Sequence, residues 1–405
     1  MTITAKKGTI LMITIIKNAD IYKPKHIGIK DVLLIDSKIA AVDEIISIDT
    51  NGAVDVVEID AKGKSLVPGF IDSHVHILGG GGEGGFSTRT PEASLTGLTT
   101  AGVTTVVGCL GTDGVARDMI SLLAKARGLD EEGITAYIYT GSYRLPLKTI
   151  TGEIMKDIMA VDKIIGIGEV AISDHRSSQP TFEEFIRAVA DARVAGMLSG
   201  KAGIINIHLG DSPKKIDMLR RAINETEIPI TQFLPTHINR SPELFEECVN
   251  YAKDGGYIDF TGSEDPDFWE ETDGEMRFSK GLKRLLEEGI NQDNFTLSSD
   301  GQGSMPIFNE KKEYIGIGIG KSTSLIKAIK ECVFQENISL ETAIRAITCN
   351  PAKILKLKTK GKIEVNMDAD ICLLDENLDV DTVIAKGKIM VQDKKPIVYG
   401  VFENK

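Results

Sequence analysis

The sequence has few cysteines, and no two of them have the spacing of a metal or redox motif. Five cysteines occur in 405 residues, their number is odd, and no C-x-x-C pair is present. A disulfide framework needs oxidising surroundings and usually an even number of cysteines. We therefore expect a cytoplasmic protein in which the cysteines are small buried hydrophobic residues: Cys109, Cys248, Cys332, Cys349 and Cys372.

Long apolar runs and an excess of positive charge are also missing. No apolar run approaches the ~20 residues of a membrane helix. The N-terminal "AKKGTILMITIIKNAD" has a short apolar core that is interrupted by Thr14, ends at Lys17 and lacks an A-x-A site, so no export is predicted. The 59 acidic and 47 basic residues give a net charge of -12. Nucleic acids and anionic membranes need clustered Lys and Arg, so neither is an expected partner.

Strand-like and helix-like segments alternate through the middle of the chain. Eight strands alternating with helices over ~250 residues predict the α/β class and a closed (β/α)₈ TIM-like barrel, in which catalytic residues lie at the carboxyl ends of the strands. An open doubly wound sheet is the alternative. The predicted strands are "LVPGFIDSHVHI", "VTTVVGCLG", "TAYIYTGSY", "IIGIGEVAI", "IINIHLG", "ITQFLPTHI", "YIDFTG" and "FTLSSDG".

Both ends of the chain have a different pattern, with short strand-like segments and no helix-like segments between them. From about Thr9 to Glu58, short alternating segments predict antiparallel strands, and similar segments return after Cys349. Chain termini often lie close together, so both ends are expected to form one small β-sandwich domain. The predicted division is 1–66 and 350–405 for this domain and 67–349 for the barrel.

Four of the six histidines fall at predicted strand ends, and two of these are only one residue apart. Residues two apart on a strand share a face, so His74 and His76 should point the same way. A lone H-x-H pair is a weak metal signal. His208, His237, Glu169 and Asp300 end other strands, however, and imidazole with carboxylate suits a divalent ion such as Zn²⁺. Such a barrel mouth can hold two ions about 3.5–4 Å apart, bridged by a carboxylate and a hydroxide.

These motifs resemble the metal-dependent amidohydrolases and, within them, the isoaspartyl (β-aspartyl) dipeptidases. The superfamily resemblance rests on "PGFIDSHVH", the strand-end histidines and "SSDG". The narrower resemblance rests on "GGGGEGG", "TRTPE", "VVGCLGTDG", "TGSYRLP", "AISDHRS", "LPTHINR" and "SSDGQGS". It implies two Zn²⁺ per chain, a β-aspartyl dipeptide as the small-molecule substrate and a homo-oligomer.

The resemblance also implies roles for individual residues. His74 and His76 would bind the more buried metal and His208 and His237 the more exposed one, with Glu169 as the bridge. Asp300 would complete the first site and act as general base and acid. The remaining implied roles are oxyanion stabilisation by Tyr143, binding of the substrate ammonium by Glu83, binding of carboxylates by Arg176 and Arg240, and minor polar contacts by Thr112 and Ser304.

Glu169 departs from the lysine form of this family. There the bridging ligand is a carboxylated lysine; here a shorter glutamate holds the place, so no carboxylated lysine is expected. The stretch is one residue longer than the lysine form, and Gly166 and Gly168 precede the glutamate. We therefore predict a β-bulge that re-aims this side chain.

The predicted activity is cleavage of the isopeptide bond of β-aspartyl dipeptides by a metal-activated hydroxide. A cyclic-amide hydrolase of the dihydroorotase or hydantoinase type is the alternative, and it would not need Glu83. A non-catalytic scaffold on the same fold is the third hypothesis. Three local features also have a purely structural interpretation. "GGGGEGG" can be a flexible linker, Asp174 is expected to be a loop or helix-capping residue, and "SEDPDFWEETDGE" is expected to be a solvated acidic loop.

Overall fold

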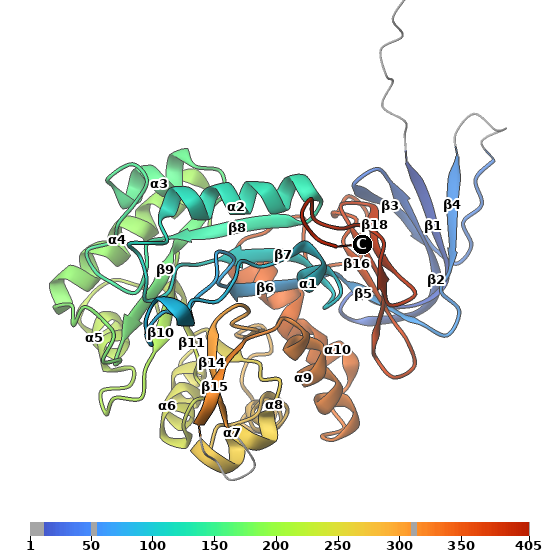
Figure 1. The fold of residues 1–405 in the computed structure, drawn as a ribbon. Helices are drawn as coiled ribbons and strands as arrows, with labels where there is room; N and C mark the ends of the chain where they lie inside the picture. The colour runs from blue at the N-terminus through green and yellow to red at the C-terminus, as the bar shows by residue number, and fades with distance from the viewer. Residues whose placement is uncertain (1–11, 50–54, 309–313, 405) are drawn as a thin grey trace, which may run out of the picture.

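The computed structural model describes residues 12–49, 55–308 and 314–404. A barrel-like part built of strands and helices lies beside a sheet that both chain ends form (Figure 1). The predicted N-terminal strand segment begins before residue 12, and that beginning lies outside the described residues. No helix in the described ranges is long and apolar enough to cross a membrane.

Six parallel strands form the curled sheet of the barrel, in the order β11-β10-β9-β8-β7-β6. Neighbours in the sheet are therefore neighbours in the chain, whereas an open doubly wound sheet reverses its strand order. A TIM-barrel-like fold is confirmed, and the open doubly wound alternative is wrong. The six strands are β6 (Phe70–Val75), β7 (Val103–Gly108), β8 (Thr135–Thr140), β9 (Ile164–Ile172), β10 (Ile204–Leu209) and β11 (Phe233–Thr236).

The last two predicted strands, β12 (Ile258–Thr261) and β13 (Phe295–Ser298), form a separate parallel pair. The Ile238 amide, just after β11, donates to the Asp259 carbonyl in β12 at 3.4 Å. On the other side, the His76 amide donates to the Gly301 carbonyl at 2.9 Å. These bonds carry the curled sheet across β12 and β13 and back to β6.

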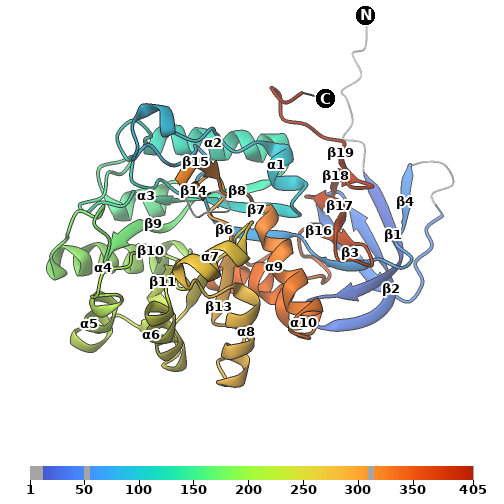
Figure 2. The same ribbon diagram turned by 60° about the horizontal axis from the view of Figure 1, so that its bottom comes forward.

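Helices cover the outside of these strands (Figure 2). The strands are buried along their whole lengths in β6, β7, β9 and β10, as expected for parallel strands with both faces covered. The helices are α1 (Leu95–Thr99), α2 (Met119–Glu132), α3 (Ile154–Ala160), α4 (Phe182–Ser199), α5 (Asp217–Glu225), α6 (Pro242–Lys253), α7 (Pro266–Asp273), α8 (Phe278–Glu287), α9 (Thr323–Phe334), α10 (Leu340–Ala343) and α11 (Cys349–Ile354), with short 3-10 turns η1 (Phe86–Thr88), η2 (Ile230–Gln232) and η3 (Ile344–Ile347).

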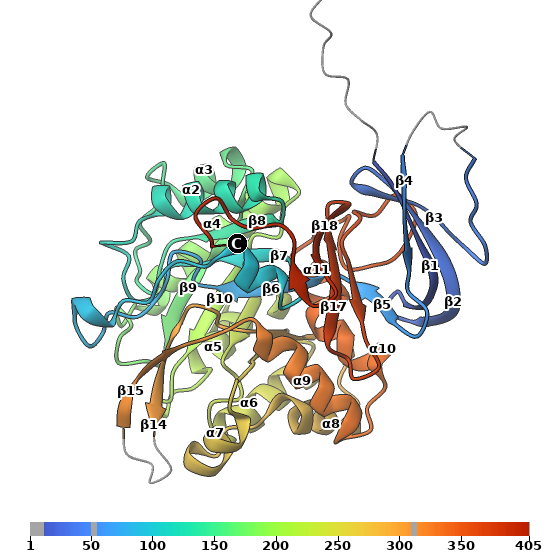
Figure 3. The same cartoon turned by 45° about the vertical axis from the view of Figure 1, so that its right-hand side comes forward.

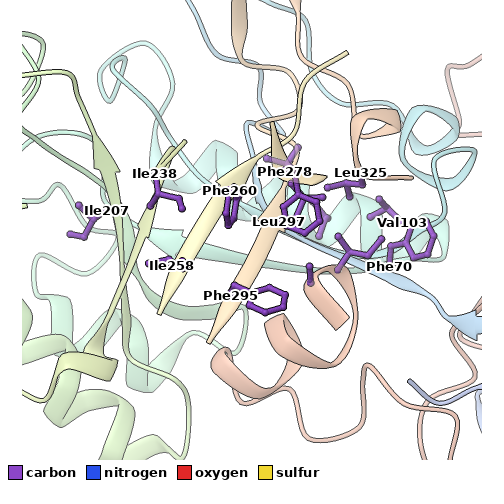
Figure 4. Packing of buried hydrophobic residues seen from close by; sticks show 14 of the residues in the cluster. Phe70, Val103, Ile207, Ile238, Ile258, Phe260, Phe278, Phe295, Leu297 and Leu325 are labelled. Carbon is purple, nitrogen blue, oxygen red and sulfur yellow. The ribbon is translucent and has the colours of Figure 1, made fainter. Parts of the chain in front are cut away.

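The barrel core is apolar and rich in phenylalanine. Phe70 of β6, Phe260 of β12 and Phe295 of β13 are fully buried. Figure 4 shows these rings with Phe278 of α8 and Leu325 of α9 between the strands and the outer helices. The ring centres of Phe260 and Phe278 lie 5.1 Å apart in an edge-to-face arrangement, a favourable geometry for aromatic pairs. This packing holds the strand ends, and therefore the side chains they carry, in place.

A nine-stranded sheet takes strands from both ends of the chain, as predicted. Its order is β19-β18-β17-β16-β5-β1-β2-β3, with β4 also paired to β1. The structure shows one continuous sheet. Its strands are β1 (Ile13–Tyr22), β2 (His26–Ile35), β3 (Lys38–Asp43), β4 (Val56–Asp60), β5 (Ser65–Pro68), β16 (Ile371–Leu374), β17 (Val380–Ala385), β18 (Lys388–Gln392) and β19 (Lys395–Pro396).

One expectation about this sheet is wrong. The strands predicted between Thr9 and Glu58 are not all antiparallel, because β4 pairs with β1 in parallel. The predicted first barrel strand is also divided: its beginning lies in β5, which pairs with β1 in parallel, and its remainder forms β6 in the barrel. The chain leaves β3 at the far side of β2 and crosses to the other side of β1 before β4 begins. A crossover of this kind joins parallel strands, whereas a tight hairpin joins antiparallel ones.

A hairpin follows β13 and extends from the barrel, apart from the terminal sheet (Figure 3). It consists of β14 (Ser304–Phe308) and β15 (Tyr314–Ile319), which pair antiparallel. Ser304, the first residue of the hairpin, is held close to the strand ends because the Gly320 amide donates to the Gly303 carbonyl at 3.0 Å.

Candidate metal centre and substrate pocket

The six predicted metal ligands converge at the carboxyl ends of the barrel strands. His74 lies near the end of β6, Glu169 in β9 and His208 in β10. The remaining three follow strand ends directly or closely: His76 after β6, His237 after β11 and Asp300 after β13. The side chains of His74 and Glu169 are fully buried, and the Asp300 side chain is the most exposed of the group at 19%.

His74 and His76 face the same carboxylate, as their spacing predicts. The His74 Nε2 atom lies 3.3 Å from Glu169 Oε2, and the His76 Nε2 atom lies 3.8 Å from the same oxygen. The two ring centres are 5.5 Å apart. Alternation along the strand therefore brings both imidazoles to one point, as a shared metal requires.

The Glu169 carboxylate lies between two histidine pairs. Its Oε1 atom is 2.7 Å from His208 Nδ1 and 3.3 Å from His237 Nε2, while Oε2 faces the other pair. One oxygen per pair is the arrangement that a bridging carboxylate needs. The structure thus puts Glu169 where the sequence predicts the bridge.

A β-bulge in β9 gives Glu169 this orientation, which confirms the prediction of a bulge. Ile205 pairs with Ile167 and Ile207 with Val170, so two residues of β9 oppose one residue of β10. Gly168 is one of the two residues of β9 that form the bulge, and it has a φ of +150°. A Cβ atom there would lie 2.8 Å from the Asn206 Cβ. Only glycine suits both this backbone conformation and this close approach.

Three buried polar atoms at the centre have no hydrogen-bond partner among the described residues: His74 Nε2, Glu169 Oε2 and Asp300 Oδ1. Asp300 Oδ1 lies 3.0 Å from His76 Nε2 and 3.7 Å from His74 Nε2. Buried polar groups are normally paired, so atoms left without a bond in such a cluster indicate a missing ligand. The convergent nitrogen and oxygen atoms fit a divalent cation.

The outward-facing nitrogen of each histidine has its own partner. This arrangement is typical of metal sites, where a second hydrogen bond fixes the ring's tautomer and orientation. The partners are Asn206 Oδ1 for His74 Nδ1 (3.1 Å), Cys109 Sγ for His76 Nδ1 (3.7 Å), Asp174 Oδ2 for His208 Nε2 (2.9 Å) and Thr261 Oγ1 for His237 Nδ1 (2.6 Å).

The charge states of Glu169 and His237 also suit a cation. Burial lowers the pKa of His74 and His76, but the Cys109 thiol and the carboxylates of Glu169 and Asp300 outweigh burial and raise the pKa of both rings well above its usual value. Burial raises the pKa of Glu169, but the His74 ring and bonds from His208 and His237 outweigh burial and hold this pKa well below its usual value. Burial lowers the pKa of His237 to about 3, so its ring is neutral at pH 7. An ionised carboxylate and a neutral imidazole are the forms that bind metals.

Two residues at the centre make contacts that their sequence patterns do not predict. Cys109 is buried, as expected, but its thiol lies beside His76 and belongs to a possible ligand cluster with His74, His76 and Glu169. Its position directly after β7, another strand end, was the available signal. Asp174 does bond to the Arg176 amide at 2.7 Å, as a loop residue would, but it also contacts His208.

A cavity of about 300 Å³ opens beside the metal ligands. Every predicted substrate-contacting residue lines it: Glu83, Thr112, Tyr143, Arg176, Arg240 and Ser304. The Thr112 hydroxyl donates to Glu83 Oε1 at 2.7 Å, and Arg176 Nη1 lies 3.5 Å from the same oxygen. Glu83, Arg176 and Arg240 thus contribute one carboxylate and two guanidinium groups to the pocket, a combination that suits a zwitterionic or doubly charged ligand. The lining also contains Arg117 and the carboxylates of Asp113, Asp211, Asp273, Glu275 and Asp300.

The glycine-rich loop that carries Glu83 is folded onto the site. The Gly80 amide donates to Thr90 Oγ1 at 2.7 Å and to the Gln302 carbonyl at 3.0 Å. At Gly81 the φ is +67°, and a Cβ atom would lie 2.6 Å from the Thr88 carbonyl oxygen. The alternative of a flexible linker is wrong, because these glycines permit a tightly packed loop.

Tyr143 lies between the metal ligands and the pocket. Its hydroxyl is 2.8 Å from His208 Nδ1. Burial, together with the charge of Glu169, raises the pKa of Tyr143 well above its usual value. The phenol therefore keeps its proton and can donate a hydrogen bond toward a reacting oxygen.

The segment "SEDPDFWEETDGE" forms part of the pocket and is not simply a solvated acidic loop. Residues 266–273 form α7, and Trp269 and Glu275 line the cavity. Burial raises the pKa of Glu275 to about 7, against the effect of Arg240. These contacts depend on the path of the loop after β12, for which the sequence has no periodic signal.

The strand-end histidines and carboxylates around such a pocket define a metal-dependent hydrolase of the barrel type. The sequence profile of the amidohydrolase family matches residues 65–390, and the chain belongs to this family. The β-aspartyl dipeptidase of Fervidobacterium islandicum AW-1, solved in complex with β-Asp-Leu, is 44% identical. The match covers 97% of this chain and 100% of that one, with a TM-score of 0.86. The predicted resemblance to β-aspartyl dipeptidases is therefore confirmed.

Other relatives are more distant. A dihydroorotase of Elusimicrobium minutum is 27% identical over 406 residues, which cover 90% of this chain and 88% of that protein. A D-hydantoinase of Thermus sp. is 16% identical with a TM-score of 0.65, covering 96% of this chain and 98% of that one. At this identity the likeness shows the fold alone.

Proposed function

We propose that this chain hydrolyses the isopeptide bond of β-aspartyl dipeptides. The observation that carries the proposal is the position of Glu83: its carboxylate faces Arg176 in a cavity that the metal ligands also line. A β-aspartyl dipeptide has a free ammonium group and two carboxylates around one amide. Glu83 can pair with the ammonium group, and Arg176 and Arg240 can pair with the two carboxylates.

In this proposal, His74, His76, Glu169 and Asp300 hold one Zn²⁺, and His208, His237 and Glu169 hold a second. When bound, such ions lower the pKa of water and polarise the scissile carbonyl. Tetrahedral N and O ligation suits zinc, and other divalent metals are an alternative.

Individual residues of the chain bind the substrate, transfer the proton and stabilise the oxyanion. Glu83 binds the substrate ammonium, assisted by Thr112, while Arg176 and Arg240 bind carboxylates and Ser304 makes a minor polar contact. Asp300 accepts the proton of the attacking water and delivers it to the leaving amine as the C–N bond breaks. Tyr143 donates a hydrogen bond to the oxyanion. Proton and charge balance without any further reactant.

The dipeptidase of F. islandicum, crystallised with β-Asp-Leu, supports this substrate class. We assign catalysis to residues 67–349 and propose that residues 1–66 and 350–405 form a β-sandwich, into whose sheet β5 carries Val67 and Pro68 across this boundary. We further propose a cytoplasmic homo-oligomer that has no nucleic-acid or membrane partner.

A cyclic-amide hydrolase is the second candidate, and the dihydroorotase relative favours it. A cyclic amide of this kind has no free ammonium group, so Glu83 would have no cationic group of the substrate to bind. The non-catalytic scaffold is disfavoured because such a protein does not need convergent metal ligands or a carboxylate, Asp300, placed as a general base.

The test is a parallel assay of the metal-loaded protein with β-Asp-Leu, α-Asp-Leu, dihydroorotate and hydantoin. We expect β-Asp-Leu to be cleaved with the highest kcat/KM. Glu83→Gln should reduce kcat/KM for β-Asp-Leu strongly and leave the metal content unchanged. Faster turnover of dihydroorotate or hydantoin than of β-Asp-Leu, or an unchanged kcat/KM in Glu83→Gln, would overturn the proposal.

A further inference from the structure

Asp174 contacts a metal ligand and a substrate-binding residue at the same time. Its Oδ2 atom lies 2.9 Å from His208 Nε2 and accepts from Arg176 Nη2 at 2.7 Å. Its Oδ1 atom accepts from the Arg176 amide at 2.7 Å and from Arg176 Nε at 3.0 Å. A carboxylate has about four acceptor positions, and all of them are used here.

The contact with His208 selects one form of its ring. The Asp174 carboxylate can only accept, so the proton of a neutral His208 must be on Nε2. The Nδ1 lone pair then faces Glu169 Oε1, 2.7 Å away, where the second cation would bind.

The contact with Arg176 orients the pocket. Two parallel bonds from Nε and Nη2 fix the plane of the guanidinium group. Its third nitrogen, Nη1, is then directed to Glu83, 3.5 Å away, and the group lies 5.5 Å from the centre of the Tyr143 ring. Asp174 is not among the described residues that line the cavity, whereas Arg176 and His208 are, so any effect on substrate must pass through one of these two residues.

The backbone is built for this approach. A Cβ atom at Gly210 would lie 2.3 Å from the Ser173 carbonyl oxygen and 2.6 Å from the Asp174 Cβ. A glycine two residues after His208 thus lets the loop after β9 close onto the end of β10. Asp174 itself is 7% exposed.

We propose that Asp174 is a positioning residue that couples the metal centre to substrate binding, by holding His208 toward the metal site and Arg176 toward Glu83. The inference rests on the proposed function for its substrate-binding half only. The effect on metal binding follows from the His208 contact and is independent of which amide the enzyme cleaves.

The experiment compares Asp174→Asn with wild type in two measurements. The asparagine keeps the size but replaces one acceptor oxygen with a donor, so it cannot satisfy His208 and Arg176 together. We expect Zn²⁺ affinity to fall about 10–100-fold, as measured by calorimetric titration of apoprotein. We also expect KM for β-Asp-Leu to rise at least about 10-fold.

Two further variants separate the halves of the proposal. Arg176→Lys keeps the charge but lacks the planar fork, and should raise KM without weakening Zn²⁺ binding. In a double-mutant cycle, Asp174→Asn and Arg176→Lys should then be non-additive in KM. Asp217→Asn, at an exposed position on α5, is the matched control and should change neither quantity.

The outcomes are distinct. A folded Asp174→Asn that binds Zn²⁺ as wild type does and has an unchanged KM would overturn the inference, as would a lower melting temperature with both binding quantities unchanged. If wild type cleaves no β-aspartyl dipeptide, the proposed function fails, while the Zn²⁺ titration still decides the role of Asp174 at His208.

Discussion

At the scale of single residues, the length of Glu169 determines how the centre is assembled. A carboxylated lysine must be formed from CO₂, whereas glutamate already carries its carboxylate. The bulge at Gly168 brings the shorter side chain to within 2.7 Å of His208 and 3.3 Å of His74. The backbone thus compensates for the missing length.

We therefore expect apoprotein to regain full activity with Zn²⁺ in bicarbonate-free buffer, with about two metals per chain. Glu169→Ala should lose much of the metal and most of the activity, because two cations would face each other without a bridging anion. Glu169→Gln, which keeps the shape without the charge, separates the effect of charge from that of packing. The measurements are the metal content per chain and kcat of wild type and of both Glu169 variants. Bicarbonate-dependent reconstitution of wild type would contradict it.

The role of Asp300 is tested separately. Burial raises the pKa of Asp300, but the hydrogen bond and charge of His76 outweigh burial and hold this pKa below its usual value. The carboxylate is therefore ionised and able to accept a proton. Asp300→Asn should lower kcat at least ~10²-fold, the usual contribution of general acid–base catalysis. Metal content must be measured with it, and near-normal turnover at normal metal content would exclude the role.

At the scale of elements, the close packing of β9 against β10 near the metal ligands depends on Gly168. A Cβ atom at Gly168 would lie 3.0 Å from the Asn206 carbonyl oxygen as well as close to its Cβ. Asn206 in turn contacts His74 Nδ1 at 3.1 Å. A substitution here should therefore affect both strand packing and the orientation of a ligand.

Gly168→Ala is expected to destabilise the fold by about 1–3 kcal/mol, the cost of a residue in a sparsely populated backbone region. It should also weaken Zn²⁺ binding. The matched control is Gly128→Ala in α2, where a Cβ atom would meet nothing within 4 Å and alanine should stabilise by about 0.5–1 kcal/mol. Denaturant titrations of both variants check the prediction. Equal stability of Gly168→Ala and wild type would contradict it.

At the scale of the whole molecule, a buried cation joins the terminal sheet to the barrel. Lys360 Nζ donates to Thr135 Oγ1 at the start of β8 at 2.7 Å. It also pairs with Asp370, just before β16, and lies 3.0 Å from Asp368. Lys386 pairs with Asp130 of α2 at 3.0 Å, at a more exposed place on the same junction.

Lys360→Met should reduce the free energy of unfolding by about 3–5 kcal/mol, because it leaves the buried Asp370 carboxylate without its cation. Lys386→Met, at a half-exposed pair, should cost about 0–1 kcal/mol. Urea denaturation of the two variants under identical conditions is the measurement. A Lys360→Met variant no less stable than Lys386→Met would contradict the importance of the buried pair.

The same pair predicts a pH dependence. Burial lowers the pKa of Lys360, but Asp370 and Asp368 outweigh burial and leave it above its usual value. A raised lysine pKa means that the folded state holds the proton more tightly than the unfolded state. The pair's contribution is then complete below pH ~10.4 and is lost as the pH rises through the folded pKa. Unfolding measured between pH 9 and 11 should show this loss in wild type and not in Lys360→Met.

Much of the barrel and of the metal centre follows from local patterns in the sequence. Strand runs with polar ends mark the eight strands, and the two-residue period of a strand brings His74 and His76 to one face. Gly166 and Gly168 beside Glu169 indicate the bulge. The substrate roles of Glu83, Arg176 and Arg240 come from the family resemblance, because no local pattern says which distant loop will face the metals.

Only the tertiary structure decided the remaining contacts. Four contacts join segments whose distance depends on the path of a loop. They are the parallel pairing of β4 and β5 with β1, the thiol of Cys109 beside His76, the bonds of Asp174 to His208 and Arg176, and the placement of Trp269 in the pocket. Periodicity and composition describe the environment of a residue along its own element. Contacts between elements depend on how those elements pack, and that is determined by the whole chain at once.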